Sequence, residues 1–316
     1  MATVSMKNSS GLTHETWFVP VDIITNIGLL CGSLLVTMFF FVILFDKTCR
    51  TIPMLLVGNS CLAGIVFGAL MYWMNLFKLM NDYAQIEYQD TFCNFRGYFG
   101  YSTCSIFNCS FLIQALYRFV RVLYPARLNF QSWKFQLGLI IFSWLFGILF
   151  PIGFMLDDEI RYNPANQICQ LPLRFSRSII YMAFCAYFIP VSLTMIIYIL
   201  LVAYVKRMSK RVASNNSLSR AKQELKMVRR TVILVSILVI YCLPYAMFIL
   251  LSFFISIPKY QARISYIFID PSYLFAIITL YQFTDPLKES IKKIFTCQNN
   301  RVQPPRTAAT GMWKRT

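Results

Sequence analysis

Seven near-continuous apolar runs dominate the chain, and they restrict its possible folds more than any other feature. Each run is long enough to cross about 30 Å of hydrocarbon as a helix, and each is too long for one strand. Because lipid cannot hydrogen-bond to an exposed backbone, only helices or closed barrels span a bilayer. We therefore predict an all-α integral membrane protein built as a seven-transmembrane helix bundle. The runs cover approximately residues 21–45, 52–77, 94–123, 134–156, 177–205, 228–255 and 264–286.

Composition and charge support this assignment. The chain is 57% hydrophobic and only 14% charged, whereas soluble domains carry about 25% charged residues. A net charge of +17 would suggest nucleic acid for a soluble protein. Here 22 of the 30 Lys and Arg residues fall on one side if the N-terminus is outside. The positive-inside rule then predicts a multi-pass plasma-membrane protein with an extracellular N-terminus and a cytoplasmic C-terminus. Its basic face would contact anionic membrane lipids, with no nucleic-acid partner.

The chain divides into four expected parts. Residues 1–20 form an extracellular N-terminus, and residues 21–286 form the bundle. After Pro286, Lys alternates with Ile and Phe at helical spacing, which predicts a short amphipathic eighth helix over 287–297 at the membrane interface. Residues 298–316 are expected to be a disordered cytoplasmic tail.

Three covalent features are predicted from the topology. Of the ten cysteines, only Cys93 and Cys169 lie on the outer side, where oxidation is permitted. We expect them to form a disulfide that pins the second outer loop across the mouth of the third span; two free buried thiols are the alternative. Asn8 begins a glycosylation sequon on the same side. Cys297 is either a palmitoylation site or an ordinary buried cysteine.

Small and polar residues in the first two runs suggest close helix packing. Glycine lets helix backbones approach each other where lipid provides no hydrophobic drive. Asn59 and Ser60 could add hydrogen bonds between helices. The glycines concerned are Gly28, Gly32, Gly58, Gly64 and Gly68.

The predicted outer segments are richer in acids than the rest of the surface. Such a rim would attract a cationic ligand, although a solvated face is the simpler interpretation. The acids are Glu15, Asp22, Asp82, Glu87, Asp90, Asp157, Asp158, Glu159 and Asp270.

Arg118 stands at the predicted inner end of the third run. An arginine there costs a few kcal/mol if it is left unpaired, so it must reach the headgroups or meet an acceptor. Prolines interrupt the fifth, sixth and seventh runs at Pro190, Pro244 and Pro286. Each removes a helical hydrogen bond and can bend its helix.

These spacings resemble those of the rhodopsin-like, or class A, G protein-coupled receptors over residues 20 to 297. Cys93 precedes Arg118 by 25 residues, as the outer cysteine precedes the arginine of the family's Asp/Glu-Arg-Tyr motif. The remaining matches are Trp144 in the fourth run, Pro190 followed by Tyr198, Cys242-Leu243-Pro244 in place of Cys-Trp-x-Pro, and Asp285-Pro286 in place of Asn/Asp-Pro-x-x-Tyr.

The resemblance implies a receptor that transmits an extracellular ligand signal to a heterotrimeric G protein. In the family, an acid at the foot of helix six holds the arginine in the inactive state. Glu224 lies 20 residues before Pro244, where that acid is expected. Breaking the Arg118–Glu224 pair would free the arginine for the G protein, and Tyr198 would stabilise the open state.

The sequence departs from the family pattern at several positions. Tyr117 replaces the acid before Arg118, and Leu243 replaces the tryptophan of helix six. Gly64 stands where the second helix normally carries an aspartate. The family's sodium pocket is therefore expected to be missing or to rest on Asp285 alone.

The sequence excludes two ligand classes more clearly than it identifies one. Gly100 occupies the position of the aspartate that anchors amines in aminergic receptors, so a monoamine is not expected. The absence of lysine from 264–286 excludes a retinal Schiff base. A basic peptide is the first expectation and a lipid-like molecule the second. By resemblance, the pocket residues are Gly100, Tyr101, Cys104, Met182, Tyr245 and Phe275.

Two other functions are alternatives to a receptor. A seven-helix channel or transporter needs charge at mid-membrane, for which Asp285 is the chief candidate. An enzyme is not expected, because the chain has one histidine, His14, and no recognisable catalytic or phosphate-binding motif. We likewise expect no cofactor and no metal site.

The proposed ion pair generates a test. Glu224→Ala should raise ligand-independent signalling, because loss of the pair favours the open state by up to a few kcal/mol. Second-messenger output in transfected cells measures this effect. Unchanged basal output with normal surface expression would count against the pair.

Overall fold

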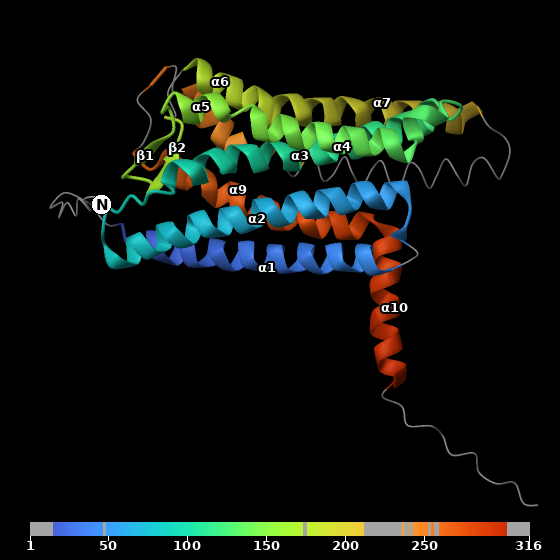
Figure 1. Cartoon of the computed structure of the whole chain (residues 1–316), viewed down its shortest axis with the longest axis horizontal. Coiled ribbons are helices and arrows are strands. Elements are labelled where there is room, and N and C mark those ends of the chain that lie inside the picture. Colours follow the sequence, from blue (N-terminus) through green and yellow to red (C-terminus); the bar gives the residue numbers. More distant parts are fainter. Residues whose placement is uncertain are drawn as a thin grey trace, which may run out of the picture.

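The computed structural model describes most of the chain as a bundle of long helices lying side by side (Figure 1). The described residues are 15–46, 49–172, 176–211, 236, 240, 243–251, 254–255 and 259–301. The long helices are α1 (Phe18–Phe45), α2 (Ile52–Ala84), α3 (Cys93–Leu123), α4 (Trp133–Leu149), α7 (Ile189–Arg211), α9 (Gln261–Phe283) and α10 (Asp285–Arg301). The shorter elements are the 3-10 helix η2 (Leu128–Gln131), α5 (Ile152–Leu156), β1 (Arg161–Asn163), β2 (Ile168–Gln170), α6 (Arg177–Ala183) and the π-helix η3 (Phe184–Phe188).

The predicted membrane spans correspond to these helices. Six helical stretches in the described part are long and apolar enough to cross a bilayer. They match six of the seven runs, with α4 joined to α5 and α6 joined to α7 through η3. Residues 243–251, within the remaining run, are also helical.

Helix α2 is longer than predicted. It continues to Ala84 instead of ending at 77, so Lys78 and Asp82 lie on the helix and not in a loop. Both side chains are buried, at 5% and 2% exposure, which their ion pairs described below make possible. The helix ends where Gln85 adopts a left-handed backbone with φ of 54°, which ends the regular helical hydrogen bonding.

The chain turns sharply after α9. The sequence placed Asp285 and Pro286 at the end of the seventh span, but α9 ends at Phe283 and these two residues begin α10. Proline is tolerated there because the first turn of a helix needs no backbone donor from it. Helix α10 projects from the end of the bundle roughly perpendicular to the long helices, and it extends beyond the predicted range 287–297 (Figure 1).

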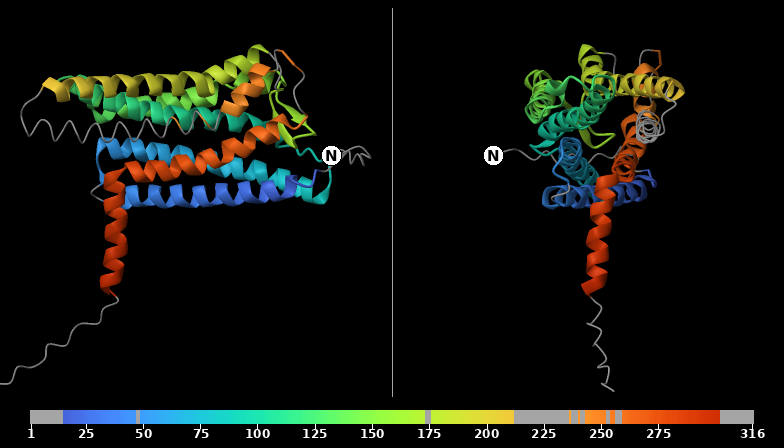
Figure 2. Two further views of the ribbon diagram at one scale, coloured as in Figure 1. Left: turned by 180° about the vertical axis from the view of Figure 1, so that it is seen from behind. Right: turned by 90° about the vertical axis from the view of Figure 1, so that its right-hand side faces the viewer.

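A small β-hairpin lies at one end of the bundle, a feature that the all-α prediction did not contain. Strands β1 and β2 are antiparallel, with Tyr162 opposite Cys169. Cys169 forms a disulfide with Cys93 at the start of α3, with a Cα–Cα distance of 5.4 Å. The predicted disulfide is confirmed. We call this end of the bundle the hairpin end and the opposite end, where α10 begins, the α10 end; Figure 2 shows both.

Helices α1, α2 and α9 meet through glycines. The Tyr273 hydroxyl of α9 donates a hydrogen bond to the Gly64 carbonyl of α2 at 2.9 Å. A Cβ added at Gly68 would overlap this hydroxyl and would lie 2.6 Å from Ser33 Oγ of α1. The predicted packing role of Gly68 is therefore confirmed, because the contact leaves no room for a methyl group.

Two predicted polar contacts between helices are also present. Trp144 Nε1 on α4 donates to Asn59 Oδ1 on α2 at 2.9 Å. Gln114 on α3 donates to Ser60 Oγ on α2 at 2.6 Å. These bonds fix α2 against both neighbours without leaving the polar atoms that form them unpaired in the apolar interior.

The glycine contact predicts the effect of one methyl group. Gly68→Ala should lower the melting temperature of the purified protein, since overpacking at such a site costs about 1–3 kcal/mol. Gly28→Ala is the matched control, because no atom lies within 4 Å of its added Cβ. Equal melting temperatures for the two variants would contradict the proposed packing.

Candidate functional site

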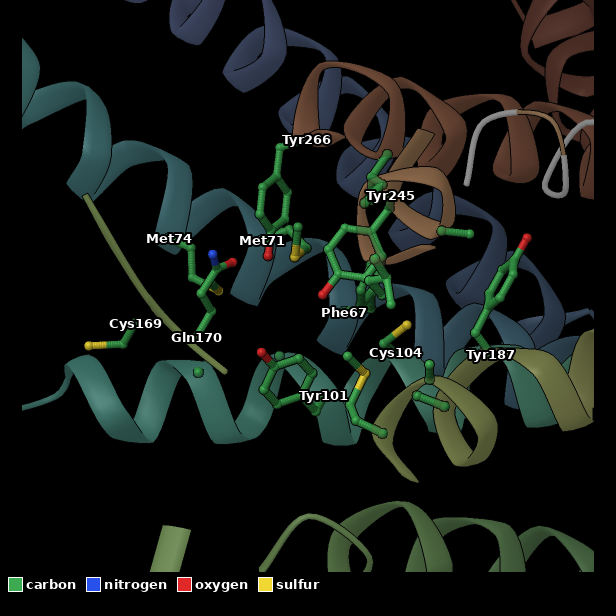
Figure 3. Close-up of a pocket in the computed structure, with 18 of the residues that line it drawn as sticks. Phe67, Met71, Met74, Tyr101, Cys104, Cys169, Gln170, Tyr187, Tyr245 and Tyr266 are labelled. Carbon is green, nitrogen blue, oxygen red and sulfur yellow. The ribbon is translucent and has the colours of Figure 1, made fainter. Parts of the chain in front are cut away.

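A cavity of about 120 Å³ lies inside the bundle near the hairpin end. Helices α2, α3 and α9, the segment η3 and the helical residues 243–251 form its walls, and Cys169 and Gln170 of β2 form part of its lining (Figure 3). No charged side chain from the described part of the chain lines it. The lining is instead apolar, aromatic and rich in sulfur, as in pockets for uncharged organic ligands. We call it the ligand cavity.

Four tyrosines and Gln170 are the residues with polar side chains, apart from the cysteines, in the lining of the ligand cavity. Tyr101 from α3, Tyr245 from the 243–251 segment and Tyr266 from α9 point into the same space (Figure 3). Phenolic hydroxyls can donate or accept hydrogen bonds while their rings contribute apolar surface. The cavity can therefore orient a molecule that is mostly apolar and carries one or two polar atoms.

The structure brings together five of the six pocket residues expected from the sequence. Gly100, Tyr101, Cys104, Met182 and Tyr245 all line the ligand cavity. The prediction for Phe275 was wrong, because this residue is not part of the lining and is 41% exposed on α9. A motif match gives a residue's position along a helix, but it does not give the direction in which the side chain points.

The lining residues of α2, and Tyr266 on α9, were not predicted from the sequence. Phe67, Met71 and Met74 line the cavity from α2, and Tyr266 lines it from α9. The spacing of the three α2 residues, four and then three positions apart, places them on one helix face. This pattern was available in the sequence, but only the packing shows that the face is turned towards the cavity.

The hairpin is held over the ligand cavity by short contacts with α3. The backbone N–H of Leu171 donates to the Tyr101 hydroxyl oxygen at 2.8 Å. A Cβ added at Gly97 would lie 2.7 Å from the Cys169 carbonyl oxygen, so the strand approaches α3 where a glycine provides the room. Together with the disulfide, these contacts fix the lining formed by β2.

Four buried charged residues form a network at the hairpin end, which we call the ion network: Asp22, Lys78, Asp82 and Arg263. Lys78 Nζ lies 2.9 Å from Asp22 Oδ1. Arg263 forms a two-pronged pair with Asp82, with Nη2 2.8 Å from Oδ1, and its Nη1 lies 3.6 Å from Asp22 Oδ2. The network therefore joins α1, α2 and α9. Buried charges persist only when they are paired in this way.

Arg263 also attaches the hairpin to α9. Its Nε donates to the Ala165 carbonyl at 3.1 Å, and its backbone N–H donates to Asn166 Oδ1 at 3.2 Å. Within the hairpin, the Tyr162 hydroxyl donates to Gln167 Oε1 at 2.6 Å. Burial, with a smaller effect of nearby acids, raises the pKa of this phenol above its usual range, so it remains protonated.

The structure corrects the prediction of an acidic rim. Asp22 and Asp82 are buried in the ion network, and Asp90 forms a two-pronged pair with Arg96 at 2.6 and 2.7 Å. Asp270 is also buried, at 2% exposure. These acids do not present a free negative surface, whereas Asp157 and Asp158 do lie exposed.

Of the predicted switch residues, Arg118 lies near the α10 end, whereas Pro244 adjoins Tyr245 of the ligand cavity. Arg118 is half-buried near the end of α3, and Tyr198 is fully buried on the neighbouring α7 at 1% exposure. Tyr117 packs against Leu56 and Ile113. Pro244 lies half-buried in the helical residues 243–251.

The structure does not place Asp285 at mid-membrane, contrary to expectation. Its carboxylate is 52% exposed at the start of α10, with Lys288 Nζ at 3.7 Å. Pro286 beside it is exposed.

Three predicted residues cannot be placed. Asn8 and Glu224 lie outside the described residues, and of Cys297 only the backbone in α10 is described. Within the described part of the chain, no group of three His, Cys, Asp or Glu side chains could hold a metal ion.

The ion network predicts a large effect of one substitution. Arg263→Met should lower stability by about 3–5 kcal/mol, because it leaves the buried Asp82 without its cation. Thermal unfolding in detergent measures this loss. Arg161→Met is the control, since Arg161 is exposed and makes only a 3.4 Å bond to the Asp158 carbonyl. A similar melting temperature for both variants would show that the network contributes little.

Comparisons with known proteins agree with this architecture. The family model of the seven-transmembrane receptors of the rhodopsin family matches residues 36–286. The crystal structure of squid rhodopsin is similar, with a TM-score of 0.75 and 16% identity, over 94% of this chain and 90% of that chain. At this identity the likeness shows the fold alone. No curated protein sequence matched the chain. Because the family model covers most of the sequence, the chain belongs to the rhodopsin-like, or class A, family of G protein-coupled receptors.

Proposed function

We propose that this multi-pass membrane receptor responds to a lipid-like ligand bound in the ligand cavity and signals to a heterotrimeric G protein at the α10 end. The proposed ligand class rests on the lining of the cavity, which has four tyrosines and no charged side chain among the described residues. Burying an uncompensated charge there would be costly. A basic peptide, the first expectation from sequence, would also need free acids, and several rim acids are already paired.

The orientation follows from charge. The topology predicted from the sequence assigns 22 of the 30 Lys and Arg residues to one side, together with the segment that begins α10. This supports a cytoplasmic α10 end and an extracellular hairpin end in the plasma membrane. The disulfide at the hairpin end supports the same orientation, because disulfides persist in oxidising compartments. The amphipathic α10 and the basic residues near it would lie against anionic lipid headgroups.

Arg118 is the proposed link to the G protein. It is half-buried near the end of α3, beside the helix that carries the buried Tyr198. Ligand binding would favour a bundle in which the α10 end opens, and the arginine would then contact the G protein. A ligand can shift this equilibrium only by its difference in affinity for the two states.

A channel or transporter is a weaker alternative. Such proteins need polar or charged groups along a central path, while the central cavity here is lined by no charged residue that the structure describes. Family membership also favours a receptor, and members of this family are not enzymes.

A second-messenger screen tests the proposal. Cells expressing the chain are exposed separately to lipid fractions and to basic peptides, and we expect a response to lipid. Gly100→Leu should abolish it by filling the cavity, because the nearest atom to an added Cβ is Met74 Sδ at 3.7 Å. Gly138→Leu is the matched control, with no atom within 4 Å of its added Cβ.

Arg118→Ala in the same screen separates binding from transduction. It should abolish the response while labelled ligand still binds at the cell surface. A response to peptides alone would reject the ligand class but keep the receptor. An intact response in Arg118→Ala would reject the proposed coupling.

A further inference from the structure

A second, smaller cavity lies between α1, α2 and α9 near the ion network. Its volume is about 10 Å³, which is about the space that one water-sized particle requires. Tyr266 lines both this cavity and the ligand cavity. The polar residues of the small cavity are Asp22, Thr25, Lys78, Arg263, Tyr266 and Asp270.

Asp270 lies close to the ion network but is not part of it. It is 2% exposed, and neither of its carboxylate oxygens has a hydrogen-bond partner among the described residues. From α2, Asn75 lies close enough to act as a donor with one N–H while its other N–H bonds the Met71 carbonyl at 3.0 Å, and Lys78 is paired with Asp22. Asp270 therefore has no cation of its own. A buried carboxylate without a paired cation is costly, so the site favours either a proton or a bound positive charge.

The charges around the small cavity do not balance. Lys78 pairs with Asp22, and Arg263 pairs with Asp82. When all five groups are ionised, three carboxylates face two cations, and the excess negative charge falls on Asp270. Asp22 Oδ2 is a further acceptor without a hydrogen bond, since Arg263 approaches it only to 3.6 Å. Unsatisfied acceptors therefore gather at a cavity that could contain a particle carrying one positive charge.

We propose that the small cavity binds a compact monovalent cation, held by the carboxylate of Asp270 together with Asp22 Oδ2 and the Thr25 hydroxyl oxygen. A sodium ion or the ammonium head of an amine matches the size of the cavity and the requirement for oxygen acceptors. A trimethylammonium group is too large. The bound cation would neutralise the cluster and join α1 to α9 beside Tyr266. This inference depends on neither the ligand class nor the coupling proposed above.

Melting temperatures of the full-length receptor in lipid nanodiscs test the site. The protein is unfolded in sodium chloride, methylammonium chloride or choline chloride at equal ionic strength, so that charge screening is constant. Sodium or methylammonium should raise the melting temperature by about 2–4 °C over choline, because a ligand that binds only the folded state stabilises it. The salt that gives the larger shift identifies the preferred cation.

Three variants make the result specific. Asp270→Asn should lose the shift, since the amide keeps the shape of the side chain but removes its charge. Thr25→Val should reduce the shift, and it serves as the test if Asp270→Asn does not fold. Asp157→Asn should keep the full shift, because Asp157 is an exposed acid at the same end of the bundle.

Three results would overturn the proposal. Equal melting temperatures in all three salts would show that no cation binds. A shift that persists in Asp270→Asn would place the cation elsewhere. The third result is a melting temperature that depends on pH in choline chloride but does not change with sodium or methylammonium. It would show that a proton on Asp270, and not a bound cation, neutralises the cluster.

Discussion

A charge in the apolar interior of a membrane protein is stable only beside an opposite charge, and this constraint organises the hairpin end of the receptor. Arg263 meets it by pairing with Asp82 while also binding the Ala165 carbonyl of the hairpin. One guanidinium thus joins α9, α2 and the hairpin. The position of the hairpin beside the ligand cavity therefore depends on electrostatic pairing as well as on the disulfide.

Tyr101 connects the hairpin to the ligand cavity more directly. Its hydroxyl accepts a hydrogen bond from Leu171, and the same residue lines the cavity. A ligand that bonded to this hydroxyl would change the electronic environment of a contact that holds the hairpin. The Tyr101 side chain therefore links the lining of the cavity to the position of the hairpin.

The sequence was informative where a property depends on local pattern. Hydropathy located the helices, and the sidedness of ten cysteines identified the disulfide pair. The sequence was not informative where a property depends on contacts between distant parts of the chain. Asp82 looked like part of a free acidic rim because its partner Arg263 is 181 residues away. Phe275 was misplaced because a motif match fixes a position along a helix but not the direction that the side chain faces. The start of α10 at Asp285 depended on a chain turn that hydropathy does not record.

The glycine contact between α1, α2 and α9 limits how the receptor can change shape. A methyl group at Gly68 would overlap the Tyr273 hydroxyl and crowd Ser33 Oγ, so the three helices are closely packed at this point. A change of shape that keeps this contact would leave α1, α2 and α9 together. It would fall on the other wall of the ligand cavity, where η3 and the helical residues 243–251 lie. The π-helical geometry of η3 interrupts the regular hydrogen bonding between α6 and α7, so this wall of the cavity is also the less regular one.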